Sequence, residues 1–137
     1  MNIELTEKQF RRLIDLVYVG NWILNSTREE HDRIADYDDA ESALLSHCAG
    51  VGMGAIVRPE GRKFRFSAAF EQGGIHEAIS DYEDAVFFEI LAEELSRRDM
   101  EDESLDPLDM AELKVRIDRY MAEFEANGTN NLILETL

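Results

Sequence analysis

Signals for the start of a helix, each followed by apolar residues at helical spacing, recur along this chain of 137 residues and constrain its fold most. Thr6 and Gln9 form a capping box, in which the threonine side chain accepts from the backbone N–H three residues later. Leu5 before this cap and Phe10 after it fit a hydrophobic staple. From Phe10 onward apolar residues recur at intervals of three and four, so we expect a helix over about residues 7–26.

A second apolar stripe predicts a helix that begins near Asp38 and ends in the glycines from Gly50 onward. Both His47 and Cys48 lie on the apolar face of this helix. We therefore expect Cys48 to be a buried structural cysteine, and His47 to be a hydrogen-bonded core histidine rather than a metal ligand. The polar segment between the first two helices, Thr27–Ala35, is expected to form a short helix or a turn.

The longest apolar run predicts the helix at the centre of the fold. Ser80 and Glu83 form another capping pair, and a long helix is expected to follow to about Arg98. Apolar residues cover most of the circumference of this helix, over residues 81–98. A helix that is apolar nearly all round is usually central, so we expect the other helices to pack around it.

The last helix is predicted from its two ends. Asp106 suits an N-cap, and Pro107 suits the first helical position, where its missing N–H leaves no hydrogen bond unmade. The apolar residues after Pro107 keep helical spacing until Gly128, a typical residue after a helix end. The acidic segment 99–106 is expected to be the loop between the last two helices.

The fold class that follows is mainly α. We expect a single compact domain over residues 1–137, with four or five helices around the central helix and at most one or two very short strands. Residues 63–66 alternate between charged and aromatic side chains, which is typical of a strand, and Arg58–Gly61 has turn chemistry. The other candidates for strands are the two ends of the chain, residues 3–5 paired with residues 131–134.

Charge is the most unusual feature of the composition. Thirty acidic residues stand against fourteen basic ones, which gives a formal net charge of −16. Such a charge favours solubility and repels nucleic acids and anionic membranes. It attracts cations or a basic protein partner, and it also suits a protein that mimics a nucleic acid. A solvated acidic surface without a specific role is the simpler interpretation, and it stays open.

Several other features bear on where the protein works. One cysteine excludes an intramolecular disulfide and a cysteine-rich zinc site. The residues after Met1 have neither the basic region nor the apolar region of a secretory signal. No run approaches the roughly 18 apolar residues that a membrane span needs. We therefore expect a cytoplasmic protein.

The first and the last helix carry a resemblance. The segment Leu16–Ser26 with Arg28, and the closing helix with Tyr120 and Phe124 before Asn127-Gly128, resemble one family of small bacterial proteins of unknown function. The resemblance covers mainly the first helix and about the last 20 residues. It implies a bacterial cytoplasmic protein, and it implies no activity, cofactor or functional residue.

Four carboxylates are candidates for a metal site. Glu29 and Asp32 are three residues apart, and Glu89 and Glu93 are four apart, so each pair lies within one helical turn. Paired carboxylates on helices suit Mg²⁺ or Mn²⁺, because hard cations prefer several oxygen ligands. Such spacings also arise by chance in a chain this acidic, and a solvated surface is the alternative interpretation.

One basic cluster lacks the usual explanation for surface arginines. Elsewhere, acidic residues stand four positions before arginines, an arrangement that supports a helix. Arg58, Arg62, Lys63 and Arg65 lie instead in the irregular middle of the chain. They could bind an anionic ligand or an acidic face of another copy. The alternative is an edge strand that its charges protect from aggregation.

No catalytic or cofactor motif is present in the sequence, and no cofactor is indicated. Our first hypothesis is a non-enzymatic protein-interaction or regulatory module. The alternatives are a divalent-metal-dependent hydrolase of a nucleotide or phosphate ester, and a DNA-mimic inhibitor. The hydrolase requires carboxylates that converge in a cleft, whereas the mimic requires carboxylates spread over a convex surface.

Overall fold

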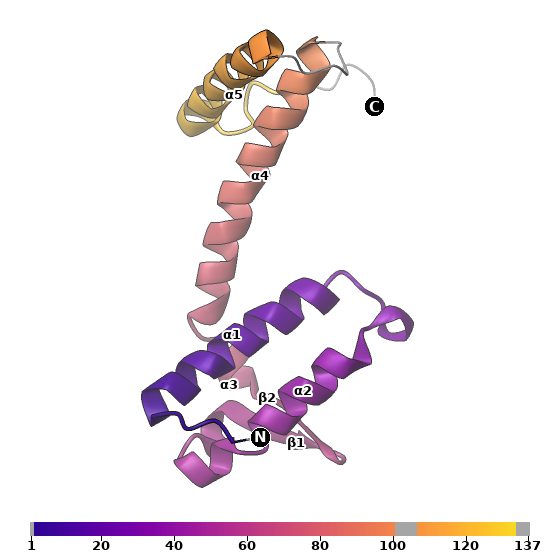
Figure 1. Cartoon of the computed structure of the whole chain (residues 1–137), viewed down its shortest axis with the longest axis vertical. Helices are drawn as coiled ribbons and strands as arrows, with labels where there is room; N and C mark the ends of the chain where they lie inside the picture. The colour runs from indigo at the N-terminus through magenta and orange to yellow at the C-terminus, as the bar shows by residue number, and fades with distance from the viewer. Residues whose placement is uncertain (1, 101–106, 134–137) are drawn as a thin grey trace. The chain divides into compact units, whose positions relative to one another are not determined.

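The computed structural model describes residues 2–100 and 107–133 (Figure 1). Over these residues it contains five α-helices, short 3-10 helices and one two-stranded antiparallel sheet, which confirms the mainly α fold. Contacts within the chain divide it into two compact units, Met1–Ile79 and Ser80–Leu137. The single domain over the whole chain stays a prediction.

The first unit holds most of the elements. In chain order they are α1 (Glu7–Asn25), η1 (Glu30–Asp32), α2 (Ala35–Leu45), η2 (Cys48–Val51), η3 (Gly54–Ile56), β1 (Val57–Glu60), β2 (Lys63–Phe66), α3 (Ala68–Glu71) and the start of α4 (Ile75–Met100). Figure 1 shows α1 and α2 side by side, with the β1–β2 hairpin next to α2.

The start of α1 confirms the predicted capping box. The Thr6 hydroxyl accepts from the Gln9 backbone N–H at 3.3 Å, and the Gln9 side-chain oxygen accepts from the Thr6 backbone N–H at 2.9 Å. The helix then runs to Asn25, within a residue of the predicted end. Two backbone donors that a helix start leaves free are therefore satisfied by side chains.

The buried face of α2 differs from the predicted one. Buried positions follow the spacing Asp38, Glu41, Leu45 and Cys48, whereas the alanines at 40 and 43 are exposed. Cys48 is buried, as predicted. The prediction of a core His47 was wrong: the helix ends at Leu45, so His47 precedes a separate 3-10 turn with its side chain exposed.

The hairpin confirms the predicted strand at 63–66 and corrects the turn before it. Val57–Glu60 is the partner strand, with Arg58 opposite Arg65. The central residues of the turn lie two positions later than predicted, at Gly61 and Arg62, and Gly61 has φ +63°. This left-handed conformation suits a residue without a Cβ.

Aromatic side chains close the core of the first unit. The buried cluster consists of Ile14, Tyr18, Leu45, Cys48, Phe66, Phe70 and Ile79. The Tyr18 ring meets Phe66 and Phe70 edge-on, at centroid distances of 4.8 and 5.1 Å. Its hydroxyl shares a 2.7 Å hydrogen bond with Nε2 of His76. Tyr18 therefore joins α1, β2, α3 and the start of α4.

Helix α4 begins earlier than predicted. Ser67 caps the short α3, which the sequence did not predict, by accepting from the Phe70 backbone N–H at 3.3 Å. The chain then turns at Gly73 and Gly74, and α4 starts directly afterwards, at Ile75. A Cβ at Gly73 would lie 3.1 Å from the Phe70 carbonyl oxygen, a tight contact that a larger residue could make only if the backbone shifted slightly. The glycines, and not the Ser80 capping pair, set the start of the helix.

The second unit pairs the remainder of α4 with α5 (Pro107–Asn127). Phe88 of α4 packs on Phe124 of α5 with ring centroids 5.4 Å apart, and Ala92 is fully buried. We expected α4 to be buried on all sides as a central helix, but part of its apolar surface is exposed. Phe87 and Ile90 are 52% and 56% exposed. A single partner helix within its unit covers only one side of α4.

Other predictions fall at the ends of the described segments. Asp99 belongs to α4 rather than to a loop, and the proposed N-cap Asp106 lies outside the described residues. Residues 3–5 form no strand, and neither do residues 131–133. Leu134, the last residue of the predicted terminal strand, lies outside the described residues.

We expect replacement of Asn25 by alanine to destabilise the first unit. Asn25 is 1% exposed; its side-chain oxygen accepts from the Ile34 backbone N–H at 2.8 Å, and its amide donates to Asn21 at 2.7 Å. Loss of both bonds leaves buried polar groups unpaired, so the free energy of unfolding should fall by about 1–3 kcal/mol. Urea unfolding followed by the fluorescence of Trp22, the only tryptophan, measures this change.

The matched control is Asn2→Ala, since Asn2 is exposed. That substitution should change the free energy of unfolding by less than about 0.5 kcal/mol. Equal effects of the two substitutions would contradict a structural role for the buried Asn25 amide.

Candidate functional site

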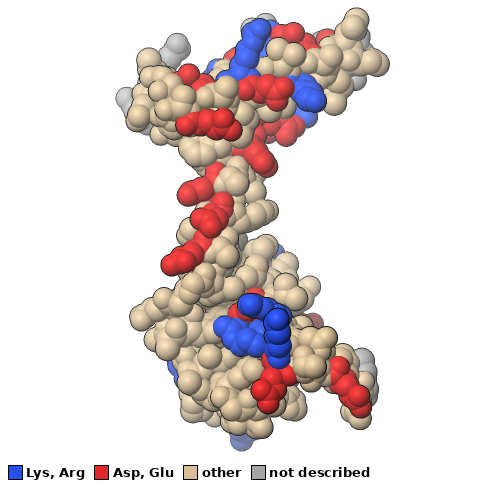
Figure 2. All heavy atoms as spheres, turned by 90° about the vertical axis from the view of Figure 1, so that its left-hand side faces the viewer, with Lys and Arg blue, Asp and Glu red and all other residues tan. Residues whose placement is uncertain are grey.

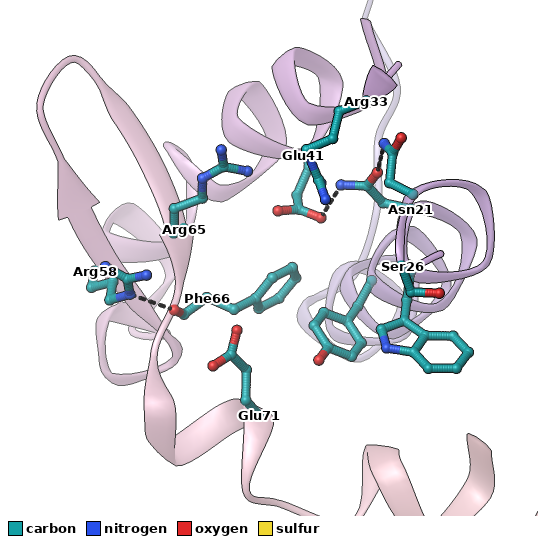
Figure 3. Close-up of a pocket in the computed structure, with 11 residues that line it drawn as sticks. Asn21, Ser26, Arg33, Glu41, Arg58, Arg65, Phe66 and Glu71 are labelled. Atoms are coloured by element: carbon teal, nitrogen blue, oxygen red, sulfur yellow. Dashed lines mark hydrogen bonds between the residues drawn. The ribbon is translucent and has the colours of Figure 1, made fainter. Parts of the chain in front are cut away.

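A pocket of about 180 Å³ opens between α1, α2, the hairpin and α3 (Figure 3). We call it the Glu41 pocket. It is lined by Tyr18, Asn21, Trp22, Asn25, Ser26, Arg33, Glu41, Arg58, Arg65, Phe66 and Glu71. All these residues belong to the first unit.

One amide group organises the floor of the Glu41 pocket. Nδ2 of the buried Asn21 donates to Asp38 Oδ1 at 3.0 Å and to Glu41 Oε2 at 2.8 Å. The Asn21 oxygen accepts from Asn25, which in turn binds the backbone of Ile34 just before α2. Two asparagines one turn apart on α1 thereby fix the start and the buried face of α2.

Asp38 is the carboxylate that the arginines neutralise. Arg33 binds it through two donors, with Nε to Oδ2 at 2.9 Å and Nη2 to Oδ1 at 2.6 Å, and Arg65 Nη1 lies 3.4 Å from Oδ1. The hydrogen bonds from Arg33 hold the pKa of Asp38 well below its usual range, with a further contribution from Asn21. Asp38 is therefore ionised at every pH at which the protein is expected to work.

Glu41 has the opposite environment, although it shares the same amide. It is 6% exposed, and within the described residues it accepts a hydrogen bond from Asn21 and from no arginine. Burial raises the pKa of Glu41 because the charged form loses its hydration, and nearby Asp38 adds to that shift. The Asn21 hydrogen bond and the charge of Arg65 offset only part of it. Glu41 is thus a buried carboxylate that lacks a bonded cation.

Aromatic rings and a second glutamate complete the wall. Tyr18 and Trp22 come from α1 and Phe66 from β2, and Figure 3 shows the Glu71 side chain directed from α3 into the pocket. Burial raises the pKa of the Tyr18 hydroxyl, and the charges of Glu71 and Glu41 raise it further. Both carboxylates thus act on the same phenol.

The hairpin accounts for most of the predicted basic cluster. Glu60 accepts from Arg58 Nη1 at 3.0 Å and from Arg65 Nε at 3.1 Å, so one carboxylate bridges both strands. Lys63 binds Asp39 of α2 at 2.6 Å. Arg62 lies at the turn, exposed, and makes no ion pair within the described residues. Arg58 and Arg65 reach the Glu41 pocket, whereas Arg62 and Lys63 do not line it.

The first pair of predicted metal ligands lies on the surface. Glu29 and Asp32 flank the exposed His31, at 3.6 and 3.4 Å from its two ring nitrogens. Within residues 2–100 and 107–133, no group of three or more His, Cys, Asp or Glu side chains is arranged to hold a metal ion. Glu29 and Asp32 are therefore two surface carboxylates beside one histidine.

The second pair lies on α4. Glu93 forms an ion pair with Arg97 at 2.6 Å, the expected arrangement of an acid four residues before an arginine. Glu89 is exposed. Figure 2 shows Asp and Glu side chains along α4, and a group of Lys and Arg side chains on the first unit. Glu89 and Glu93 thus belong to a stretch of α4 that carries several acidic side chains, and their role as metal ligands stays a prediction.

The sequence pattern indicates Arg58 and Arg65 as site residues, but it misses the buried acids and amides of the Glu41 pocket. It predicts a helix start from the acidic residues near Asp38, and it does not single out Asn21 and Asn25 as buried. A signal was available: Ile14, Tyr18, Asn21 and Asn25 are spaced four, three and four apart, so the asparagines continue the apolar face of α1. Amides on such a face require buried partners.

No protein-family model, curated protein or solved structure matches this chain. The resemblance of its first and last helices to a bacterial family stays a prediction, as does a cytoplasmic location. Among the described helices, none combines the length and the apolar composition needed to cross a membrane.

We expect opposite effects on stability from the two acids that share Asn21. Asp38→Asn removes the charge that Arg33 and Arg65 neutralise, so at pH 7 the free energy of unfolding should fall by about 1.5–3 kcal/mol. Glu41→Gln keeps an acceptor for Asn21 and removes a buried charge. It should leave the free energy of unfolding unchanged or raise it by up to about 1 kcal/mol. Urea unfolding of both variants measures the difference.

The pH dependence of the free energy of unfolding should also have opposite signs for Asp38 and Glu41. The lowered pKa of Asp38 gives stability above the usual aspartate range, and that stability is lost as the pH falls toward the folded-state pKa. The raised pKa of Glu41 means that its ionised form costs stability at high pH, and that this cost disappears as the pH falls below the raised value. Equal destabilisation by Asp38→Asn and Glu41→Gln at pH 7 would contradict this division.

Proposed function

We propose that this protein is a non-enzymatic binding module whose Glu41 pocket accepts a basic side chain of a partner protein. The observation that carries the proposal is the state of Glu41. Its carboxylate is almost fully buried at the pocket floor, and within the described residues no arginine donates a hydrogen bond to it. An incoming guanidinium or ammonium group supplies the missing opposite charge.

The charges around the pocket support a cation rather than an anion as the ligand. The three lining arginines already have partners: Arg33 is bound to Asp38, Arg58 to Glu60 and to a backbone carbonyl, and Arg65 to Glu60. Of the lining glutamates, neither Glu41 nor Glu71 forms an ion pair within the described residues. The net charge of −16 also attracts a basic partner over longer range.

Aromatic faces support the same ligand class. Tyr18, Trp22 and Phe66 line the pocket together with the two glutamates. A cation that meets an aromatic face gains about 0.5–2 kcal/mol, more as the site is desolvated. The combination of two carboxylates and several rings suits arginine in particular, because its planar guanidinium both stacks and forms paired hydrogen bonds.

The two alternative functions keep their status as predictions. A metal-dependent hydrolase has no supporting ligand cluster among the described residues. A DNA mimic is supported by the acidic composition alone.

We expect N-acetyl-arginine amide to bind in the Glu41 pocket and change the fluorescence of Trp22, which lines it. This probe carries one guanidinium and no other charge. Binding should be saturable with a dissociation constant of roughly 1 mM, which corresponds to about 4 kcal/mol. N-acetyl-leucine amide, which is neutral, should produce no saturable change at the same concentrations.

Variants separate the pocket from the general acidity of the protein. Glu41→Gln and Glu71→Gln should each weaken binding about tenfold, the effect of losing about 1.4 kcal/mol. Glu29→Gln makes the same charge change on a side chain that is 83% exposed and outside the pocket, and it should leave binding unchanged. Equal effects at positions 29 and 41, or no saturable change with the wild type, would refute the proposed site.

A further inference from the structure

Asp38 and Glu41 share the Asn21 amide as a hydrogen-bond donor, but their other partners differ. Asn21 donates from the same nitrogen to Asp38 and to Glu41. Asp38 also receives two hydrogen bonds from Arg33 and one from Arg65, whereas Glu41 receives none from either arginine. When two neighbouring acids differ in this way, a proton that enters the pair binds to the acid without the cations. That acid is Glu41.

The titratable and charged groups around Glu41 come from every element that packs against it. Tyr18 and the neutral Asn21 come from α1, Arg33 from the segment before α2, Asp38 from α2 itself, Arg58 from β1, Arg65 from β2 and Glu71 from α3. Tyr18 in turn bonds to His76 at the start of α4. Burial and the negative charge of Asp38 favour the neutral form of Glu41, and the two arginines offset this only through space.

We propose that a basic side chain and a proton compete for Glu41, so that occupancy of the Glu41 pocket falls as the pH falls through the range in which Glu41 becomes neutral. This inference rests on the proposed function, since it concerns the same ligand and the same pocket. It adds that binding is coupled to the protonation of one residue.

The proton balance is simple. In the empty pocket at low pH, Glu41 is a neutral carboxylic acid. When a guanidinium enters, the O–H bond of Glu41 breaks, the carboxylate stays beside the cation, and the proton leaves to water through the pocket opening. The guanidinium keeps its own proton at all relevant pH values, because its pKa lies above about 12. Any pH dependence of binding therefore belongs to the protein.

The sign follows from linkage. Because the bound cation favours the charged form, Glu41 holds fewer protons in the occupied pocket than in the empty one, so affinity rises with pH. Between the two titration ranges, the dissociation constant should increase about tenfold for each unit by which the pH falls. Above the range of the empty pocket, Glu41 is ionised in both states and affinity becomes constant.

The experiment is a titration of N-acetyl-arginine amide at a series of pH values between about 4.5 and 8, followed by Trp22 fluorescence. Calorimetry in two buffers of different ionisation enthalpy counts the protons released on binding. We expect weaker binding at the acidic end, and release of up to about one proton per ligand where the two titration ranges differ.

Three variants identify the group that titrates. Glu41→Gln should bind weakly with a flat pH profile and no proton release. Glu71→Gln should bind more weakly than the wild type but keep the pH dependence. His76→Gln should also keep it, which excludes the histidine bonded to Tyr18 as its source. Unfolding curves of each variant confirm that the first unit remains folded under the conditions of the titration.

The outcomes separate this inference from the proposed function. Saturable binding with the same affinity at every pH and no proton release would overturn the coupling and leave the binding module in place. Loss of the pH dependence in Glu71→Gln or His76→Gln, with its retention in Glu41→Gln, would assign the proton to another residue and overturn the inference. Absence of binding at every pH would overturn both proposals.

Discussion

The first unit depends on the hydrogen bonds that the Asn21 amide makes between α1 and α2. Its nitrogen reaches Asp38 and Glu41, while its oxygen is held by Asn25. An apolar residue at position 21 could not satisfy either acid, and both acids would then be buried without a donor from α1. The pairing of the two helices therefore combines buried polar groups with an apolar cluster to which Ile14 of α1 and Leu45 of α2 both belong.

The hydrogen-bonded groups of Asn21, Asp38 and Glu41 form a polar seam between α1 and α2. This seam lies beside the apolar core, and residues from both line the Glu41 pocket. Tyr18 belongs to both regions: its ring packs on Phe66 and Phe70, while its hydroxyl bonds to His76. Asp38 and its arginines make a neutralised and rigid side of the seam. Glu41 is left without such partners, and a buried charge of this kind costs stability. Binding sites commonly contain residues such as Glu41, which lower the stability of the protein in exchange for function.

Local rules predicted the parts of this fold that depend on local chemistry. The capping box of α1 and the strand at 63–66 were predictable, since neighbouring residues determine them. The burial of Cys48 was predicted correctly, but from a helix that ends before it, at Leu45. The buried face of α2 was not, because Asp38 and Glu41 are buried only when asparagines on α1 face them. The basic hairpin residues were recognised as a cluster, but the acids that neutralise them became known only from the fold. The buried acids of the site could thus not be predicted, because their partners come from distant segments of the chain.

The central claim is that one amide holds two acids of opposite character. Carbon NMR of the side-chain carboxyl groups, followed during a pH titration of the protein without ligand, tests it most directly. We expect the pKa of Asp38 to lie below the usual aspartate range, and the pKa of Glu41 to lie above the usual glutamate value. Ordinary pKa values for both groups, or a lowered pKa for Glu41, would show that the Asn21 amide does not hold two acids of opposite character.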